Sequence, residues 1–349
     1  MLNRFIILFF LILQSIVALP QKPVTTFDIP IFAYHRFGDD RYPSTNISLK
    51  IFEEQLQYLK QNNYTVLTFG DAIAKWENSG PIPEKAVILT VDDGYLSFYT
   101  GGFPLLKKYD FKATVFVQTG TVGGGDFMSW QQIKEIQDAG IEIGNHSDSH
   151  AYFVNLPENE RKRVFQLDFE TASSVLKIHL GKAPQIYAYP YGEWTKDMED
   201  VLQRKGVLAA AVQKSGVFCE SSPAFAIPRF PMGGPFATIN GFKNKLQMKA
   251  LRVAEVSPAT PFLNENPPKL TLKLVPGKIN INQAQFFVGG KKSENIEVSF
   301  DNDIPIIEVV SPEKLTDRRT LYTITAPSVD GKTWHWYSHL WISPEVKEE

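Results

Sequence analysis

The sequence contains a single cysteine, Cys219, among its 349 residues. One cysteine cannot form an internal disulfide, so side-chain packing must stabilise the fold. A lone cysteine is more often a small buried hydrophobe than a nucleophile, and no neighbour in the sequence would activate this one. The hydrophobic content of 43% is that of an ordinary globular protein and allows a core of normal size.

An excess of charge of either sign is also missing. The chain has 36 basic and 38 acidic side chains, and its formal net charge is -2. Proteins that bind nucleic acid carry a basic patch or stripe. This near balance therefore gives no reason to expect nucleic acid as a partner.

The apolar run at the N-terminus, residues 5–13, is shorter than the roughly 20 residues that a membrane-spanning helix needs. It follows the basic Arg4 and precedes the small Ala18. This pattern is typical of a signal peptide, which we assign to residues 1–19. An uncleaved N-terminal anchor is the alternative. We expect a secreted, periplasmic or cell-envelope protein with no other transmembrane segment.

Strand-like and helix-like patterns alternate from residue 20 to residue 250. Phe52, Leu56 and Leu59 recur at a helical spacing, and Ser129 can cap a helix that ends near residue 139. Short apolar runs such as 86–91 lie between the helical patterns. The alternation predicts an α/β fold with a mostly parallel sheet, open or closed into a barrel. Active groups in such folds lie at the carboxyl ends of the strands.

The composition changes after residue 250. The interval 251–268 contains four prolines and is predicted to be a linker. From 269 to 349 we find only strand patterns, beginning with Leu270, Leu272 and Leu274, which alternate with polar residues. These residues are predicted to form a C-terminal all-β sandwich domain.

Two acidic residues, Asp92 and Asp93, follow the apolar run 86–91 and precede Gly94. If this run is a core strand, both carboxylates lie at its carboxyl end. Adjacent carboxylates repel each other when both are ionised. A bound cation resolves the repulsion and leaves the second carboxylate as a base. Since Asp and Gly are also common in turns, a simple strand-end turn is the alternative.

Two of the six histidines, His146 and His150, lie in one hexapeptide after the apolar segment 141–144. Histidines at positions i and i+4 face the same way in a helix. Imidazole nitrogens and carboxylate oxygens bind zinc at about 2.0–2.2 Å. Together with Asp93 at another strand end, the pair favours a metal site with an open position for water over two surface histidines.

A third strand end carries Ala188-Tyr189-Pro190-Tyr191-Gly192. The simple interpretation is a Pro-Gly turn. The functional interpretation is the rim of a pocket, with backbone N–H groups that face the reacting atoms. We expect Pro190, Tyr191 and the nearby Trp194 to contact the substrate.

These three segments resemble the motifs of the polysaccharide deacetylase family, also called carbohydrate esterase family four or the NodB-homology family. The Thr-Phe-Asp-Asp-Gly, His-Ser/Thr-x-x-His and Arg-x-Pro-Tyr motifs of the family correspond to residues 90–94, 146–150 and 188–191. The resemblance covers roughly residues 29–231. It implies a distorted (β/α) barrel, in which Asp92 is the general base and Asp93, His146 and His150 hold the metal.

The sequence departs from the family pattern at two places. The arginine of the third motif is Ala188 here, so we expect Arg229, at a later strand end, to orient Asp92 and to contact the substrate. An arginine at the surface or at the edge of the core is the alternative. The late histidine of the family has no counterpart, since no histidine occurs between residues 180 and 334. Residues 32–35 have its Leu-x-x-His-like pattern at the N-terminus instead, as in the permuted branch that resembles poly-N-acetylglucosamine deacetylases. His35 is therefore the expected general acid, and a histidine that only caps a strand end is the alternative.

The implied reaction is the hydrolysis of N-acetyl groups on N-acetylglucosamine residues of a polysaccharide, with release of acetate. Peptidoglycan, poly-N-acetylglucosamine and a chitin-like polymer all stay open as substrates. Zinc is the expected metal, and cobalt, nickel or manganese would fit similar ligands. The alternatives are a non-catalytic carbohydrate-binding protein, a small-molecule amidase of the same superfamily, and a glycosidase with paired carboxylates, which leaves the histidines unexplained. We expect a monomer.

Overall fold

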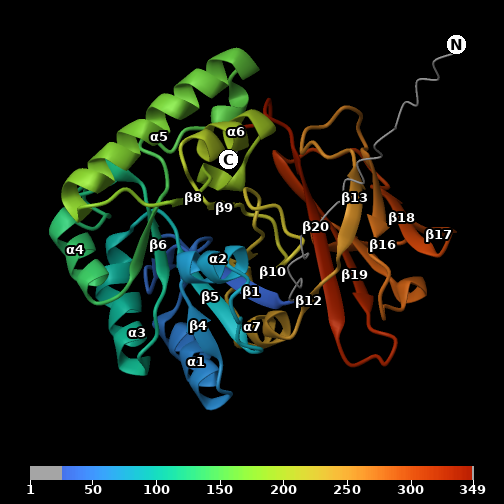
Figure 1. Ribbon diagram of the computed structural model, residues 1–349, viewed down its shortest axis with the longest axis horizontal. Helices are drawn as coiled ribbons and strands as arrows, with labels where there is room; N and C mark the ends of the chain where they lie inside the picture. The colour runs from blue at the N-terminus through green and yellow to red at the C-terminus, as the bar shows by residue number, and fades with distance from the viewer. Residues whose placement is uncertain (1–25, 348–349) are drawn as a thin grey trace, which may run out of the picture.

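The computed structural model of the protein describes residues 26–347. An α/β region, coloured blue to yellow in Figure 1, lies beside a β region coloured orange to red. The predicted signal peptide lies outside the described residues. Among the helices of the described part, none combines the length and the apolar character that a membrane crossing requires.

The α/β region is built on a nine-stranded sheet with the main order β10-β1-β5-β6-β7-β8-β9, in which β4 also pairs with β5 and β11 with β1. All of these pairs are parallel except that of β1 with β10. The strands are β1 (Asp28–Tyr34), β4 (Thr65–Leu67), β5 (Ala86–Val91), β6 (Thr114–Val117), β7 (Glu142–Asn145), β8 (Ile186–Ala188), β9 (Ala209–Ala211), β10 (Val217–Cys219) and β11 (Phe230–Pro231). A separate short pair joins β2 (Arg36–Phe37) to β3 (Asn46–Ile47).

The first and last parallel strands of this sheet lie side by side. Phe32 of β1 pairs with Phe230 of β11, and Ile31 of the same strand pairs with Ile88 of β5. The sheet is thus curled, which confirms the predicted distorted barrel. As a consequence, the residues that follow β1 lie next to the carboxyl end of β5.

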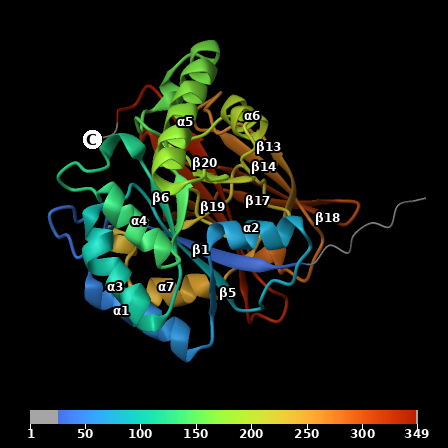
Figure 2. The same cartoon turned by 60° about the vertical axis from the view of Figure 1, so that its left-hand side comes forward.

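Helices cover the outer side of the sheet, as Figure 2 shows for α1, α3, α4 and α5. Two of them begin at serine caps: the predicted cap Ser129 forms a capping box with Gln132, and the Ser48 hydroxyl, which was not predicted, accepts a hydrogen bond from the backbone of Ile51. The helices are α1 (Leu49–Gln61), α2 (Phe69–Glu77), α3 (Phe103–Tyr109), α4 (Trp130–Asp138), α5 (Glu158–Leu180), α6 (Lys196–Arg204) and α7 (Ile239–Leu246).

The β region consists of two antiparallel-rich sheets that enclose one core. The five-stranded sheet has the order β12-β20-β19-β15-β16, and the four-stranded sheet has the order β13-β14-β18-β17. Leu272 and Ile307 from the second sheet pack in one cluster with Ile324 and Trp341 from the first, which confirms the predicted all-β part. The strands are β12 (Lys249–Ala250), β13 (Val253–Ser257), β14 (Lys269–Leu274), β15 (Gln285–Val288), β16 (Lys291–Ser293), β17 (Ile296–Asp301), β18 (Ile304–Val310), β19 (Arg319–Pro327) and β20 (Trp334–Ile342).

The hydrogen bonding of the β region begins earlier than its first predicted strand. Lys249 pairs with His335 of β20, and Val256 of β13 pairs with Leu272 of β14. The interval 251–268, expected as a linker, therefore contains a strand of the sandwich. We propose to place the start of the β region at Lys249, because this is the first residue that pairs with its strands.

Candidate functional site

The two adjacent aspartates lie at the carboxyl end of β5, whose six residues are all buried. Asp92 continues the strand direction, and its backbone N–H donates to the carbonyl of Tyr34 in β1. Asp93 has a φ of 71°, a left-handed conformation that is rare for residues other than glycine. This turn of the backbone lets the two carboxylates point to different partners.

The two histidines follow β7, but they lie on an irregular turn and not on the helix that an i, i+4 spacing suggests. Ser147 and His150 both have positive φ, 73° and 52°. The turn is held by Asp168 of α5, which accepts hydrogen bonds from the backbone N–H groups of Asp148 and Ser149 at 3.0 and 2.8 Å. Such strained conformations persist where the surroundings fix them, and they are common at functional sites.

The side chains of Asp93, His146 and His150 form the group that could hold a metal ion in the described residues. The Asp93 Oδ1 atom lies 3.2 Å from the His146 Nε2 atom and 3.3 Å from the His150 Nε2 atom. The two Nε2 atoms are 3.3 Å apart. Tetrahedral ligands at about 2.0–2.2 Å from zinc are themselves about 3.3–3.6 Å apart, so the spacing of these atoms fits a small divalent cation.

The tautomer of His146 also fits a metal ligand. Its Nδ1 atom lies 2.8 Å from the carbonyl oxygen of Ala188. A carbonyl can only accept, so Nδ1 carries a hydrogen, and in the neutral ring the lone pair of Nε2 faces Asp93 and His150. Metal-binding histidines commonly have such a carbonyl partner on the second ring nitrogen.

Arg229 lies against Asp92, where the sequence departs from the family motif. Its Nη1 and Nη2 atoms donate to the two carboxylate oxygens of Asp92 at 2.7 and 2.8 Å. Both side chains have a relative exposure of 0%. Further hydrogen bonds to the Thr90 hydroxyl and the Val212 carbonyl fix the guanidinium. Since Arg229 is enclosed, it contacts the carboxylate and does not line an open pocket.

The charges around the two aspartates keep both carboxyl groups ionised. Burial alone would raise the pKa of Asp92, but Arg229, His146 and His35 outweigh it and lower this pKa. Burial likewise opposes ionisation of Asp93, yet hydrogen bonds with His146 and His150 hold its pKa well below the ordinary value. Burial disfavours the charged form of His146, and Asp93 raises its pKa in spite of this.

His35, directly after β1, faces the same space. Its Nε2 atom is 3.9 Å from the Oδ2 atom of Asp92, and its side chain is 19% exposed. The structure thus brings together His35, Asp92 and the three candidate metal ligands, which come from the ends of β1, β5 and β7. A histidine, a buried carboxylate and a possible cation site therefore lie together at one edge of the sheet.

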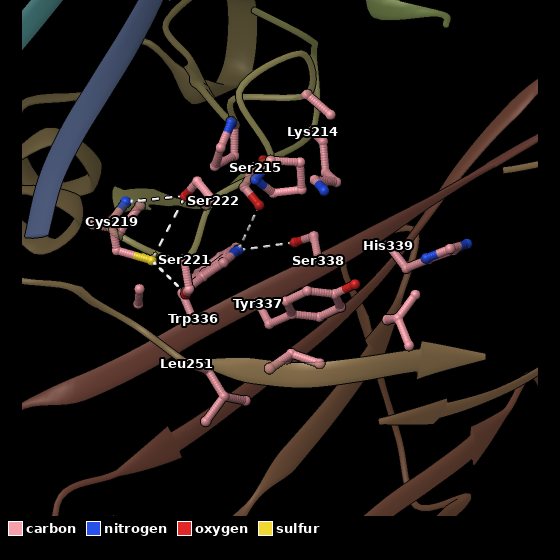
Figure 3. Close-up of a pocket in the computed structure, with 18 of the residues that line it drawn as sticks. Lys214, Ser215, Cys219, Ser221, Ser222, Leu251, Trp336, Tyr337, Ser338 and His339 are labelled. Atoms are coloured by element: carbon pink, nitrogen blue, oxygen red, sulfur yellow. Dashed lines mark hydrogen bonds between the residues drawn. The ribbon is translucent and has the colours of Figure 1, made fainter. Parts of the chain in front are cut away.

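The rim residues divide into two groups. Tyr191 has a φ of 58°, its ring stacks on Tyr152 at 3.6 Å, and it meets the His150 ring edge-on at 4.6 Å. Pro190 is buried beside it. Trp194, in contrast, lines a different pocket between the two regions; Figure 3 shows other residues of that pocket.

Several residues of the site escaped the sequence analysis. Tyr152 and Asp168 make the contacts described above, but neither is set apart by its local sequence. Thr90 belongs to the first motif, but its contact with Arg229 does not follow from that position. Asp168, for example, lies within the charged face of a long helix and looks like any solvated acid. A contact of this kind becomes visible only when α5 is packed against the turn after β7.

Known proteins with similar sequences and structures agree with the motif assignment. Residues 79–210 match the family model described as polysaccharide deacetylase. The poly-beta-1,6-N-acetyl-D-glucosamine N-deacetylase of Staphylococcus aureus (strain MRSA252) is 26% identical over 212 residues, which are 57% of this chain and 71% of that protein. The protein of the same name from Escherichia coli (strain K12) is 28% identical over 233 residues, 55% of this chain but only 34% of that protein.

Among solved structures, IcaB from Ammonifex degensii is 29% identical and superimposes with a TM-score of 0.55. The superposition covers 63% of this chain and 96% of that chain. The family match at residues 79–210 falls inside the α/β region. This region, with its curled sheet and its three strand-end motifs, therefore contains a polysaccharide deacetylase domain.

Proposed function

We propose that this protein is a metal-dependent polysaccharide N-deacetylase that acts on N-acetylglucosamine residues, with poly-β-1,6-N-acetylglucosamine as the first polymer to test. The observation that carries the proposal is the trio Asp93, His146 and His150, with ligand atoms 3.2 to 3.3 Å apart, beside an ionised carboxylate. The names of the relatives at 26% and 28% identity favour the β-1,6-linked polymer.

In this proposal Asp93, His146 and His150 hold the ion, with zinc as the first choice and cobalt, nickel or manganese as alternatives. A divalent ion supplies a Lewis acid to the site when it is bound. The chain supplies the rest. Asp92 accepts a proton from the attacking water, and Arg229 keeps that carboxylate ionised and oriented.

The remaining roles follow from where charge changes during amide hydrolysis. A backbone N–H near Tyr191 stabilises the negative charge that develops on the acetyl oxygen. His35 gives a proton to the nitrogen of the departing amino sugar. The C–N bond of the acetamide breaks, and the products are acetate and a free amine.

Location and assembly stay predictions. A secreted, periplasmic or cell-envelope location rests on residues 1–19, which lie outside the described residues, and a monomer rests on the absence of any sequence signal for assembly. The binding partner proposed is the polysaccharide substrate itself.

The test is acetate release from poly-β-1,6-N-acetylglucosamine, chitin oligosaccharides and peptidoglycan. Each polymer is assayed with the native protein, after treatment with a chelator, and after the metal is added back. We expect acetate from the first polymer, loss of activity with chelator, and recovery with zinc or cobalt. Binding of the polymer with no acetate from any of the three would favour the carbohydrate-binding alternative, and release from small acetamides alone would favour the amidase.

A further inference from the structure

The β region contacts the rim of the candidate site through two consecutive arginines, Arg318 and Arg319, at the start of β19. Arg318 lies 125 positions after its partner Glu193 in the sequence. Its Nε and Nη2 atoms donate to the two carboxylate oxygens of Glu193, each at 2.7 Å. The side chains of this pair are only 4% and 2% exposed. The result is a buried, two-pronged ion pair across the junction of the regions.

Arg318 also contacts the loop that follows the candidate ligand His150. Its Nη2 atom donates to the Asn155 side chain at 2.8 Å, and its guanidinium lies 4.2 Å from the centre of the Tyr152 ring. One guanidinium therefore joins the loop after β7 to the loop after β8.

Arg319 holds the strained residue of the rim directly. Its Nη1 atom donates to the backbone carbonyl of Tyr191 at 3.0 Å. Tyr191 has a positive φ, a strained conformation that persists only where neighbours fix it. The ring of Tyr191 lies between Tyr152 and His150. A shift of this carbonyl would move a ring that contacts a candidate metal ligand.

Leu340 and Ile342 of β20 also pack in one cluster with Phe153 and Val154 of the first loop. Two further polar contacts between the regions lie away from both loops. Trp336 of β20 donates from Nε1 to the carbonyl of Ser215, a hydrogen bond that Figure 3 shows. Arg252 makes a second, part-buried ion pair, with Nε and Nη2 donating to Glu220 at 2.6 and 2.9 Å. The contacts of Trp336 and Arg252 hold the β region against the barrel but do not involve the loops at 150–155 and 189–193. A variant at one of them therefore tests whether weaker docking of the β region is enough to change the activity.

We propose that Arg318 and Arg319 are positioning residues for the deacetylation reaction, so that the β region completes the active site of the α/β region. The inference rests on the proposed function and extends it to a part of the chain that the family match does not reach. The β region then acts as a fixed support for the loops at 150–155 and 189–193, which carry His150 and Tyr191.

The decisive variant is Arg319→Met in the full chain, which removes the donor to Tyr191 and keeps most of the apolar stem. We expect kcat for acetate release to fall about tenfold with less than about a threefold change in KM, because small displacements of reacting groups reduce turnover strongly. Arg319→Lys retains one donor and should recover most of the loss. Arg318→Met breaks a buried pair and can prevent folding, so it is not the primary variant.

The matched control is Arg252→Met, which breaks an arginine–glutamate pair of the same interface. Hydrogen exchange of the segments 150–155 and 189–193 provides a readout that does not depend on activity: it should accelerate in Arg319→Met and stay unchanged in Arg252→Met. Equal losses of kcat in both arginine variants, or native exchange and native kcat in Arg319→Met, would overturn the inference. If the wild-type protein releases no acetate, the proposed function fails, and the exchange rates alone decide whether these arginines position the rim.

Discussion

The α/β region and the β region use buried arginines in different ways. In the α/β region, Arg229 donates two hydrogen bonds of 2.7 and 2.8 Å to Asp92. Both residues lie at strand ends of the same sheet. In the β region, Arg318 reaches across the junction to Glu193, two residues after Tyr191. The first arginine acts on the proposed base itself, while the second acts on the loop around it.

This difference shows how an added region can become part of a site without supplying a reacting group. The strand ends of the barrel fix where Asp92, Asp93 and His146 lie, because each follows directly on a buried strand. The loops after those strands have fewer constraints of their own. A rigid neighbour that hydrogen-bonds to them can set their geometry.

The largest effect is expected when the chemistry of the α/β region is removed by Asp92→Asn. The amide is a poor base, so kcat for acetate release should fall by about 10³-fold, while the metal content stays native. Acetate release and metal analysis measure the two effects. Asp138→Asn, on the exposed face of α4, is the matched control and should be neutral. Near-native turnover by the Asp92 variant would remove its assignment as the base.

A somewhat smaller effect is expected for Arg229→Met, which tests whether the α/β region depends on its internal ion pair for stability. The variant leaves Asp92 buried without a counter-charge, and we expect the free energy of unfolding to fall by about 3 kcal/mol. Urea denaturation of the full chain provides the measurement. The double variant Arg229→Met/Asp92→Asn removes the charge as well and should regain part of that loss; no recovery would show that the arginine stabilises through packing alone.

His35→Gln tests the second proton-transfer residue of the α/β region. The side chain is 19% exposed, so the variant should fold normally. We expect kcat to fall by about 10²-fold, with the stability and the metal content unchanged. A substrate with a good leaving group, such as an activated acetanilide, needs less protonation and should show a smaller loss. An equal loss with both substrates contradicts the role of His35 as the acid.

The smallest effect concerns the junction itself, where Lys214 lies 5.6 Å from the Trp194 ring and 5.8 Å from the Tyr337 ring. Burial lowers the pKa of Lys214 to about 8. Below about pH 8 the folded protein holds Lys214 in its charged form, which burial disfavours. Between about pH 8 and about pH 10.4, Lys214 is protonated in the unfolded chain but neutral in the folded protein. The free energy of unfolding therefore rises with pH between these two values.

Lys214→Met should therefore stabilise the protein by about 1 kcal/mol at pH 7, less than the full shift implies because the ammonium is partly solvated. The gain should shrink between about pH 8 and about pH 10. Thermal unfolding of both proteins at pH 7 and pH 10 measures this. A pH-independent difference would show that the effect comes from packing and not from the charge.

Much of the fold could be predicted because its signals are local. The buried run of β5, the spacing of Phe52, Leu56 and Leu59, and the cap at Ser129 each depend on a few neighbouring residues. The start of the β sandwich was harder to predict from the sequence. Strand β13 has only part-buried and exposed residues, so its pattern does not differ from that of an extended linker.

The site could be predicted in part for the same reason. Asp93 and His150 stand next to predicted strands, and the carboxyl ends of parallel strands meet at one edge. Trp194 also stands near such an end, yet the turn at 190–193 directs it to another pocket. The i, i+4 spacing of the histidines suggested a helix, but the two Nε2 atoms converge through a strained turn that the spacing cannot encode.

By itself, the sequence determined which residue types stand at the ends of the strands, because strand burial, turn chemistry and motif order are all local properties. Motif order made Arg229 and His35 candidates, but only the tertiary structure decided that both side chains lie against Asp92 and that Arg318 contacts Glu193. These contacts join residues as many as 137 positions apart. The curling of one sheet and the docking of another bring these partners together. Neither the curling nor the docking can be recognised from the residues next to each partner in the sequence.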